Sequence, residues 1–146
     1  MKKLSFTITT VICFFLLYSC GYNVEFENLD RLNGYWEIKE VKRPDGKNRD
    51  YKFSETVDYI KIDSLNHGIR KKMKATVSGK YKTTPRIERF EVKKEDDSLR
   101  LYYKTEMDDW KETLVQLDKD RFAVRNERGI IYIYQRFNGF IDDGKE

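Results

Sequence analysis

The sequence predicts an all-β fold, an antiparallel up-and-down β-barrel of about eight strands. From Asn33 onward, apolar and polar residues alternate with a period of two, which is typical of half-buried strands. Aromatic residues make up 14% of the chain and prolines number two, and tyrosine and β-branched residues fit a pleated surface well. No segment has a helical period, and a meander of this many strands leaves no exposed edge if it closes into a barrel.

The N-terminus has the pattern of a signal peptide. Lys2 and Lys3 are followed by no charged residue until Glu25, and residues 11–18 are continuously apolar. A basic start and an apolar segment of this length predict a signal peptide over residues 1–19. A retained transmembrane anchor is the alternative, because the uncharged stretch is also long enough to span a bilayer.

The segment Leu17-Tyr18-Ser19-Cys20-Gly21 favours the signal peptide, because it resembles the lipobox of bacterial lipoproteins. The resemblance implies that the Cys20 thiol takes a diacylglyceryl group and that Cys20 becomes the first residue after cleavage. Two or three acyl chains on one residue anchor a protein stably in a membrane. Residues 20–32 are then the lipidated cysteine and a tether, ending in a short helical turn capped by Asp30. Gly21, followed by no acidic run, is compatible with an outer membrane location facing the periplasm.

Cysteine usage limits the chemistry of the predicted domain. The chain has two cysteines, Cys13 in the predicted signal peptide and Cys20 at the lipidation site. The remaining residues therefore have no thiolate nucleophile, no thiolate metal ligand and no disulfide. Residues 33–138 are predicted to form one domain that is held together by packing and hydrogen bonds, and residues 139–146 a flexible tail.

Strands are predicted where the alternation is clear and turn residues lie on both sides. In the segment GIRKKMKATV, the residues Ile69, Lys71, Met73, Ala75 and Val77 share one face. Pro85 cannot donate a ladder hydrogen bond, so residues 80–93 are either two strands or one strand bent around this proline. The predicted strands are 35–42, 57–63, 69–77, 80–84, 87–93, 99–105, 110–117, 121–126 and 130–137.

Two motifs connect the predicted barrel to a known family. Gly34-Tyr35-Trp36 matches the Gly-x-Trp signature of lipocalins, and Arg136 stands in the last strand where lipocalins have an arginine over that tryptophan. Residues 32–138 therefore resemble the lipocalin-like domains of Bacteroidetes-type lipoproteins, although the chain is shorter than full lipocalins and no helix follows the last strand. The resemblance implies that Trp36 and Arg136 close the blind end of the barrel, with a cation–π contact worth roughly 0.5–2 kcal/mol. Gly34, Trp36 and Arg136 are thus expected to be structural.

The alternation and the resemblance together predict a ligand-binding interior. Lys71 shares the face that is predicted to point inward, and a buried ammonium group is costly unless it is paired. It must reach the barrel mouth, pair with Glu88 or Glu112, or meet an acidic ligand, unless a bulge turns it outward. The residues predicted to line the interior are Lys71, Met73, Phe90, Tyr103, Tyr132 and Tyr134.

These residues indicate a protein that binds a small hydrophobic or amphiphilic molecule, such as a fatty acid, in the cell envelope. The alternative is a ligand-free interaction module that binds an envelope protein or a glycan through its surface. The interior of an eight-stranded barrel discriminates between them, because side chains either fill it or leave room for one small ligand.

No motif indicates an enzyme, a cofactor or a metal site. His67 is the only histidine and lies in the turn segment SLNHG, and the acidic pairs fall in turns or the tail, where a weak calcium contact is the alternative to simple solvation. No phosphate loop, serine elbow or pair of catalytic carboxylates is present. Between His67 and Lys94, basic residues greatly outnumber Glu88 and Glu91. Such a segment is either a solvated sheet face or a surface for anionic partners, and the predicted compartment argues against nucleic acid.

The lipidation site yields a direct prediction. A Cys20→Ser variant should remain an unprocessed precursor, because the thioether cannot form without the thiol. Labelled palmitate should be incorporated into the wild-type protein and not into the variant. A variant that is still acylated and cleaved would show that Cys20 is not the lipidation site.

Overall fold

The structure is a computed structural model that describes residues 24–76 and 81–139. The predicted signal peptide, Cys20 and residues 140–146 of the predicted tail lie outside these residues. The described chain contains one sheet of nine antiparallel strands, in the order β2-β1-β3-β4-β5-β6-β7-β8-β9. The strands are β1 (Gly34–Lys42), β2 (Arg49–Asp50), β3 (Thr56–Ile62), β4 (His67–Ala75), β5 (Tyr81–Glu95), β6 (Ser98–Lys104), β7 (Asp109–Leu117), β8 (Arg121–Asn126) and β9 (Ile131–Arg136).

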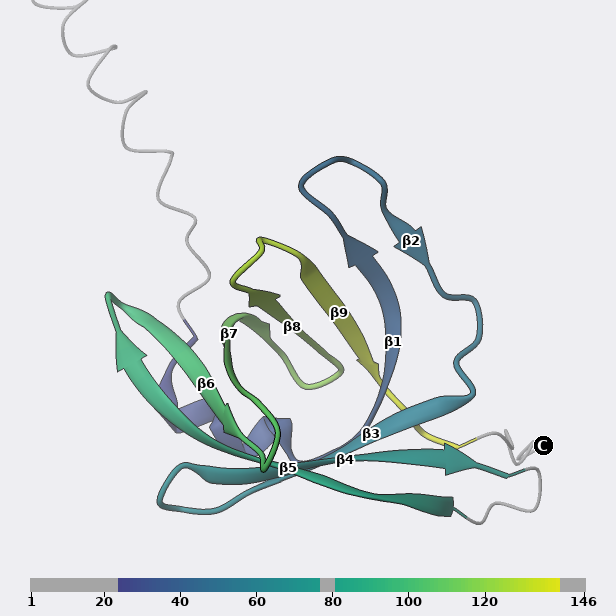
Figure 1. The fold of residues 1–146 in the computed structure, drawn as a ribbon, viewed down its shortest axis with the longest axis horizontal. Helices are drawn as coiled ribbons and strands as arrows, with labels where there is room; N and C mark the ends of the chain where they lie inside the picture. Colours follow the sequence, from purple (N-terminus) through teal and green to yellow (C-terminus); the bar gives the residue numbers. More distant parts are fainter. Residues whose placement is uncertain (1–23, 77–80, 140–146) are drawn as a thin grey trace, which may run out of the picture.

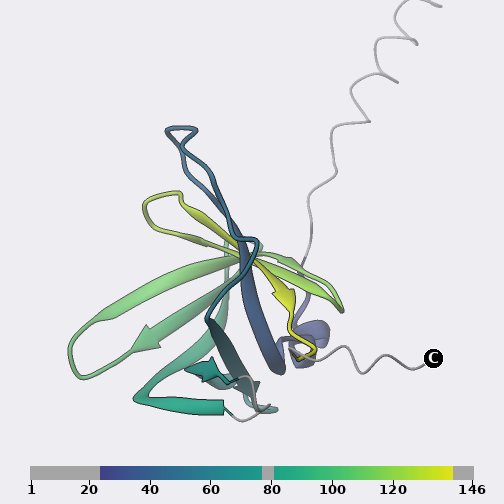
Figure 2. The same ribbon diagram turned by 90° about the vertical axis from the view of Figure 1, so that its right-hand side faces the viewer.

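The sheet closes on itself, because β1 pairs with both β3 and β9 (Figure 1). The two-residue strand β2 pairs with the far end of β1 and lies outside the closed ring of eight strands. The predicted up-and-down barrel is therefore confirmed. The predicted strands 80–84 and 87–93 are one strand, β5, whose pairing with β4 is irregular between Lys71 and Met73, opposite Pro85. In Figures 1 and 2 the β1–β2 connection projects away from the N-terminal helix.

A 3-10 helix, η2 (Phe26–Leu32), lies before the first strand. Its Leu29 and Leu32 side chains are buried in the barrel core, so the prediction that residues 20–32 form a tether is wrong for this part. The predicted helical turn is present, but Glu25 takes the N-cap position, without a side-chain bond. Asp30 instead accepts the backbone N–H of Asn33 at the other end. Within residues 24–76 and 81–139, no helix has the length and apolarity needed to cross a membrane.

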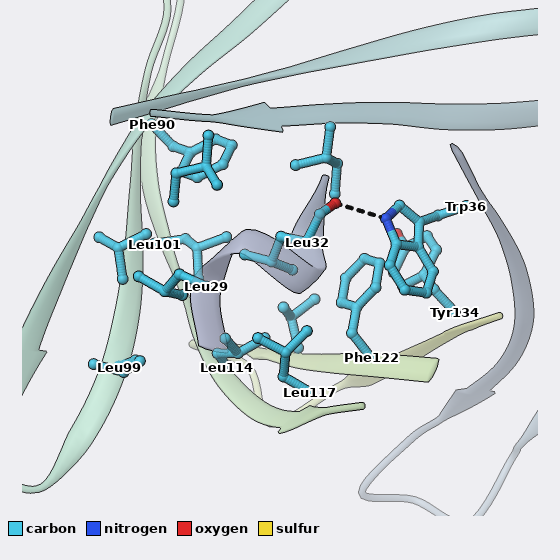
Figure 3. Packing of buried hydrophobic residues seen from close by; sticks show 14 of the residues in the cluster. Leu29, Leu32, Trp36, Phe90, Leu99, Leu101, Leu114, Leu117, Phe122 and Tyr134 are labelled. Carbon is cyan, nitrogen blue, oxygen red and sulfur yellow. Dashed lines mark hydrogen bonds between the residues drawn. The ribbon is translucent and has the colours of Figure 1, made fainter. Parts of the chain in front are cut away.

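The core fills the end of the barrel around η2 (Figure 3). Leu32 and Trp36 are completely buried, and the Trp36 indole N–H donates to the Leu32 carbonyl oxygen at 2.8 Å. Burying side chains of this size contributes roughly 1.5–3 kcal/mol each. The buried cluster consists of Leu29, Leu32, Trp36, Ile60, Ile62, Phe90, Val92, Leu99, Leu101, Tyr103, Leu114, Leu117, Phe122, Val124 and Tyr134.

Arg136 closes this end of the barrel. Its guanidinium lies 3.8 Å from the centroid of the Trp36 ring and donates hydrogen bonds to the carbonyl oxygens of Arg31, Asn33 and Lys119. These carbonyls belong to η2, to the residue between η2 and β1, and to the β7–β8 turn. Gly34 makes room for the guanidinium, because a Cβ there would lie 2.6 Å from Arg136 Nη1 and the backbone has φ +125°. The Gly-x-Trp motif and the arginine thus form one structural unit.

Strand β4 presents the opposite face from the one predicted. Arg70 pairs with Ile60 and Glu88, and Lys72 pairs with Asp58, so the even-numbered residues of β4 point into the barrel. The prediction that Lys71 and Met73 point inward is therefore wrong. Gly68 also lies on the inner face, where a Cβ would come within 2.2 Å of the Phe90 ring.

A second, smaller apolar cluster explains why the sequence is misleading here. Met73 is buried on the outside of the barrel, against Val57 of β3 and Phe137, which follows the last strand. The backbone N–H of Phe137 donates to the Tyr35 carbonyl oxygen and so holds this segment against the wall. Met73, on the apolar face of β4, is therefore buried with the chain that follows β9 and not by the barrel interior.

The contact of Arg136 with Gly34 and Trp36 leads to a prediction about the stability of the fold. An Arg136→Met variant keeps a long side chain but loses the hydrogen bonds to three carbonyl groups and the cation–π contact. Because hydrogen bonds to charged groups contribute about 1.5–3 kcal/mol, the free energy of unfolding should fall by about 2–4 kcal/mol in urea denaturation. Arg125→Met, at an exposed position of β8, is the matched control and should change it by about 0.5 kcal/mol or less. Equal losses in both variants would contradict this role for Arg136.

Candidate functional site

The predicted site residues are divided between the two sides of the barrel wall. Phe90, Tyr103 and Tyr134 are buried in the inner core, and half-buried Tyr132 packs against it. Their positions are as expected, and their role in ligand binding stays a prediction. Lys71 and Met73 lie on the outer side and cannot line the interior.

The inward cation is Arg70, one residue before the predicted Lys71. Its Nε donates to Glu88 Oε2 at 2.8 Å, and its Nη1 lies 3.3 Å from both Glu112 Oε2 and the Tyr103 hydroxyl. The guanidinium carbon is 4.8 Å from the centroid of the Tyr103 ring. We call Arg70, Glu88, Tyr103 and Glu112 the inner charge cluster. Strands β4, β5, β6 and β7 each contribute one of its members.

Burial shifts the titration of this cluster. It raises the pKa of the Glu112 carboxyl group, and the nearby Arg70 guanidinium opposes that shift. Burial also raises the pKa of the Tyr103 hydroxyl well above its usual value. Burial alone would lower the pKa of Arg70, but the surrounding oxygens of Tyr103 and Glu112 raise it, so the guanidinium is charged. The interior of the barrel thus holds a permanent cation.

A second ion pair lies beside the cluster. Lys72 Nζ is 2.9 Å from Asp58 Oδ1, and the two residues are directly opposite each other on β4 and β3. The Asp58 side chain is 5% exposed, whereas the Lys72 side chain is 55% exposed. The ammonium group therefore connects a buried carboxylate to the solvent and is accessible to a bound molecule.

Aromatic side chains surround the charged groups. The Tyr103 ring stacks on Trp110 with centroids 4.8 Å apart, and Phe90 packs against the same Tyr103 ring with centroids 5.2 Å apart. Trp110, Ile38 and Tyr132 are only half-buried. Trp110 and Tyr132 lie close to the β6–β7 and β8–β9 connections, at the end of the barrel opposite η2. This end therefore combines apolar surface with the inner cations.

The sequence predicted the two carboxylates of the inner ion pairs correctly, but it predicted Lys71 as their cation in place of Arg70. Glu88 and Glu112 were expected as inward partners of a lysine, and both instead bind Arg70. Asp58, Arg70 and Lys72 were missed because apolar residues on the other face of β4 defined the expected inner side. The signal that could have found them is Gly68, which shares a face with Arg70 and Lys72 and leaves space for an inward aromatic ring.

His67 lies on the outer surface and makes no metal site. Its Nδ1 is 4.0 Å from Asp63 Oδ1, and both side chains are more than half exposed. Among residues 24–76 and 81–139, no three histidine, cysteine, aspartate or glutamate side chains are grouped as metal ligands.

An open groove of about 940 Å³ lies against β3–β7, and Tyr103 is the one member of the inner charge cluster among its lining residues. Ile69, Arg89 and Lys104 line it and are paired across β4, β5 and β6. Their chain neighbours point into the core, so these three residues lie on the outer face of the barrel. Because neighbouring residues of a strand point to opposite faces, the charged side chains of this groove and those of the inner charge cluster lie on opposite sides of the barrel wall.

The family model of the lipocalin-like domain matches residues 32–124, and the chain belongs to this family. Domains of this fold commonly bind small hydrophobic ligands and are generally not enzymes. No curated protein matches the chain.

The solved structures that match the chain have low sequence identity. A lipocalin-like protein from Bacteroides uniformis is 11% identical, with a TM-score of 0.46 over 73% of this chain and 99% of its own. Apocrustacyanin C1 is 11% identical and lobster apocrustacyanin A1 is 12% identical. Each has a TM-score of 0.46 and matches 82% of this chain and 68% of its own.

The inner charge cluster makes a pH-dependent prediction. An Arg70→Met variant leaves buried carboxylates without their cation and should lose about 3–5 kcal/mol of unfolding free energy at pH 7. Because Arg70 lowers the pKa of Glu112, its removal raises that pKa further in the folded state. The stability contributed by protonated Glu112 is present in acid and is lost as the pH rises through the folded pKa. Urea denaturation should therefore show a smaller loss at pH 5 than at pH 7.

The double variant Arg70→Met/Glu112→Gln is the control, because its neutral amide does not ionise. It should recover part of the stability at pH 7 and reduce the pH dependence. A loss in Arg70→Met that is the same at both pH values would contradict the assignment.

Proposed function

We propose that the protein is a membrane-anchored lipocalin-like lipoprotein that binds a small amphiphilic molecule at the open end of its barrel. The observation that carries this proposal is the inner charge cluster beside the Asp58–Lys72 pair. An anionic head group is expected to meet Lys72 and Arg70. The apolar part of the ligand is expected to lie against the half-buried surfaces of Ile38, Trp110 and Tyr132.

The stability of the fold does not explain these charges. A buried ion pair is often no more stabilising than well-packed apolar side chains of the same volume, because both ions must be desolvated. A barrel optimised for stability alone would carry leucine or methionine at Arg70 and Glu112. Buried groups with shifted pKa values are instead concentrated at functional sites. The carboxylates of Glu88 and Glu112 hold the Arg70 guanidinium at a fixed position in the interior.

The affinity expected of such a site is moderate. Burying about ten methylene groups contributes roughly 8 kcal/mol before the costs of association, which supports micromolar binding. The packed core around η2 occupies the other end of the barrel, so the ligand is expected to lie near the mouth.

The proposed location depends on the N-terminal sequence, which lies outside the described residues. The signal peptide and the lipobox-like segment at Cys20 support a lipid anchor in the cell envelope, in the outer membrane and facing the periplasm. Because Phe26–Leu32 is part of the barrel, only residues 21–25 separate the lipidated cysteine from the folded domain. The barrel is therefore expected to stay close to the membrane surface, where amphiphiles are available.

A second candidate function is surface binding of an envelope protein or a glycan. The outer groove favours it, because most of the residues that line the groove are charged or polar and lie outside the core. The two functions use opposite sides of the wall and do not exclude each other.

Lys71 and Lys72 are adjacent on β4 but point to opposite faces of the barrel wall. Variants of the two residues therefore distinguish binding in the interior from binding on the outer surface. A Lys72→Gln variant, combined with Asp58→Asn to avoid leaving a buried carboxylate unpaired, should bind palmitate about tenfold more weakly than the wild type. A charged hydrogen bond contributes enough free energy for a change of this size. Lys71→Gln removes the same charge on the outer face and should bind palmitate normally.

Isothermal titration of the purified full-length protein with palmitate measures both effects. Thermal unfolding of each variant establishes that the fold is retained. Equal affinities in the Lys72→Gln/Asp58→Asn and Lys71→Gln variants would contradict a binding site at the inner cations.

A further inference from the structure

The outer groove is crossed by two rows of side chains that follow the strand pairing. The first row has one residue from each of five neighbouring strands: Lys61, Ile69, Arg89, Lys104 and Asp109. Neighbouring strands lie about 5 Å apart, so Arg89 and Lys104 are separated by about 5 Å and Lys61 and Arg89 by about 10 Å at the backbone. The row thus presents three cations along one line across the sheet and ends at the carboxylate of Asp109, directly opposite Lys104.

These three cations have no carboxylate partner. Lys61, Arg89 and Lys104 are exposed, and none of them forms an ion pair with a residue in 24–76 or 81–139. Most neighbouring charges on the same face are paired: Glu91 binds Lys93 at 3.0 Å. Unpaired cations in a groove are available to an anionic ligand.

The second row carries carboxylates whose charges are already satisfied. It consists of Asp63, His67, Glu91, Tyr102, Lys111 and Glu127. Asp63 accepts the backbone N–H groups of Leu65 and His67 at 2.9 Å, and Glu127 is 3.9 Å from Lys111. Each carboxylate has further lone pairs, so this row can accept hydrogen bonds from hydroxyl groups.

The two rows together restrict the chemistry of the ligand. A polymer that carries only anionic groups is attracted by the first row and repelled by the carboxylates of the second. A neutral ligand leaves the three cations unused. A ligand with carboxylates along one edge and hydroxyl donors along the other fits both rows, and sugar acids have this combination of groups.

We infer that the outer groove binds a short acidic oligosaccharide. Its carboxylates bind Arg89, Lys104 and Lys61, and its hydroxyl groups donate to Glu91 and Asp63. The groove volume of about 940 Å³ is near the upper end of the roughly 300–1,000 Å³ range of small-molecule sites, which suits a few sugar units. The charged side chains of this site lie on the outer wall, whereas those of the amphiphile site proposed for the interior point inward, and Tyr103 and Trp110 border both.

Titration calorimetry of the full-length protein with trigalacturonic acid tests this inference. The wild type should bind this sugar acid, and maltotriose, a neutral trisaccharide, should not bind measurably. The double variant Arg89→Gln/Lys104→Gln should bind at least about tenfold more weakly, because two charged hydrogen bonds are lost. Lys47→Gln/Lys52→Gln removes the same charge from exposed positions outside the groove and should bind like the wild type.

Four results would overturn the inference. They are an absence of trigalacturonic acid binding, an equal loss in both double variants, equal binding of maltotriose, and equal or tighter binding of a poly-glutamate peptide. The last result would identify the groove as a site for acidic peptides. Palmitate binding should be unchanged in Arg89→Gln/Lys104→Gln, so failure of this site and failure of the interior site are distinguishable.

Discussion

The barrel depends on the contact between Arg136 and Trp36. The guanidinium covers the indole ring and binds carbonyl groups of three separate segments, so the last strand, the first strand, the N-terminal helix and the β7–β8 turn meet at one side chain. Gly34 is required because only a residue without a side chain leaves room for Arg136. With this end closed and filled by Leu29 and Leu32, any ligand must enter from the opposite end.

Because apolar packing closes the end of the barrel around η2, the rest of the interior can contain charged side chains. The packed cluster around η2 supplies the apolar burial that stabilises the fold, whereas Arg70, Glu88 and Glu112 occupy the part of the interior beyond it. Met73 of β4 is buried outside the barrel, against Phe137. This strand therefore contributes to stability through its outer face and to the proposed recognition of an anion through its inner face.

The sequence was sufficient to predict the all-β barrel, most strand positions and the roles of Gly34, Trp36 and Arg136, because alternation and a motif pair determine them. It was not sufficient to orient β4, since Ile69 and Met73 suggested an inner face that is in fact the outer one. Only the register with Asp58 and Glu88 shows that Arg70 and Lys72 point inward. The burial of Leu29 and Leu32 was also missed, because a single helical turn is too short for a clear periodic pattern.

The central claim is that the mouth of the barrel binds an amphiphile with an anionic head group. Native mass spectrometry of the full-length protein, gently purified from its native source, is the test. We expect a bound mass that organic extraction releases and that fragments as an acidic amphiphile. A clean ligand-free mass, with no uptake from a mixture of fatty acids and phospholipids, would contradict it.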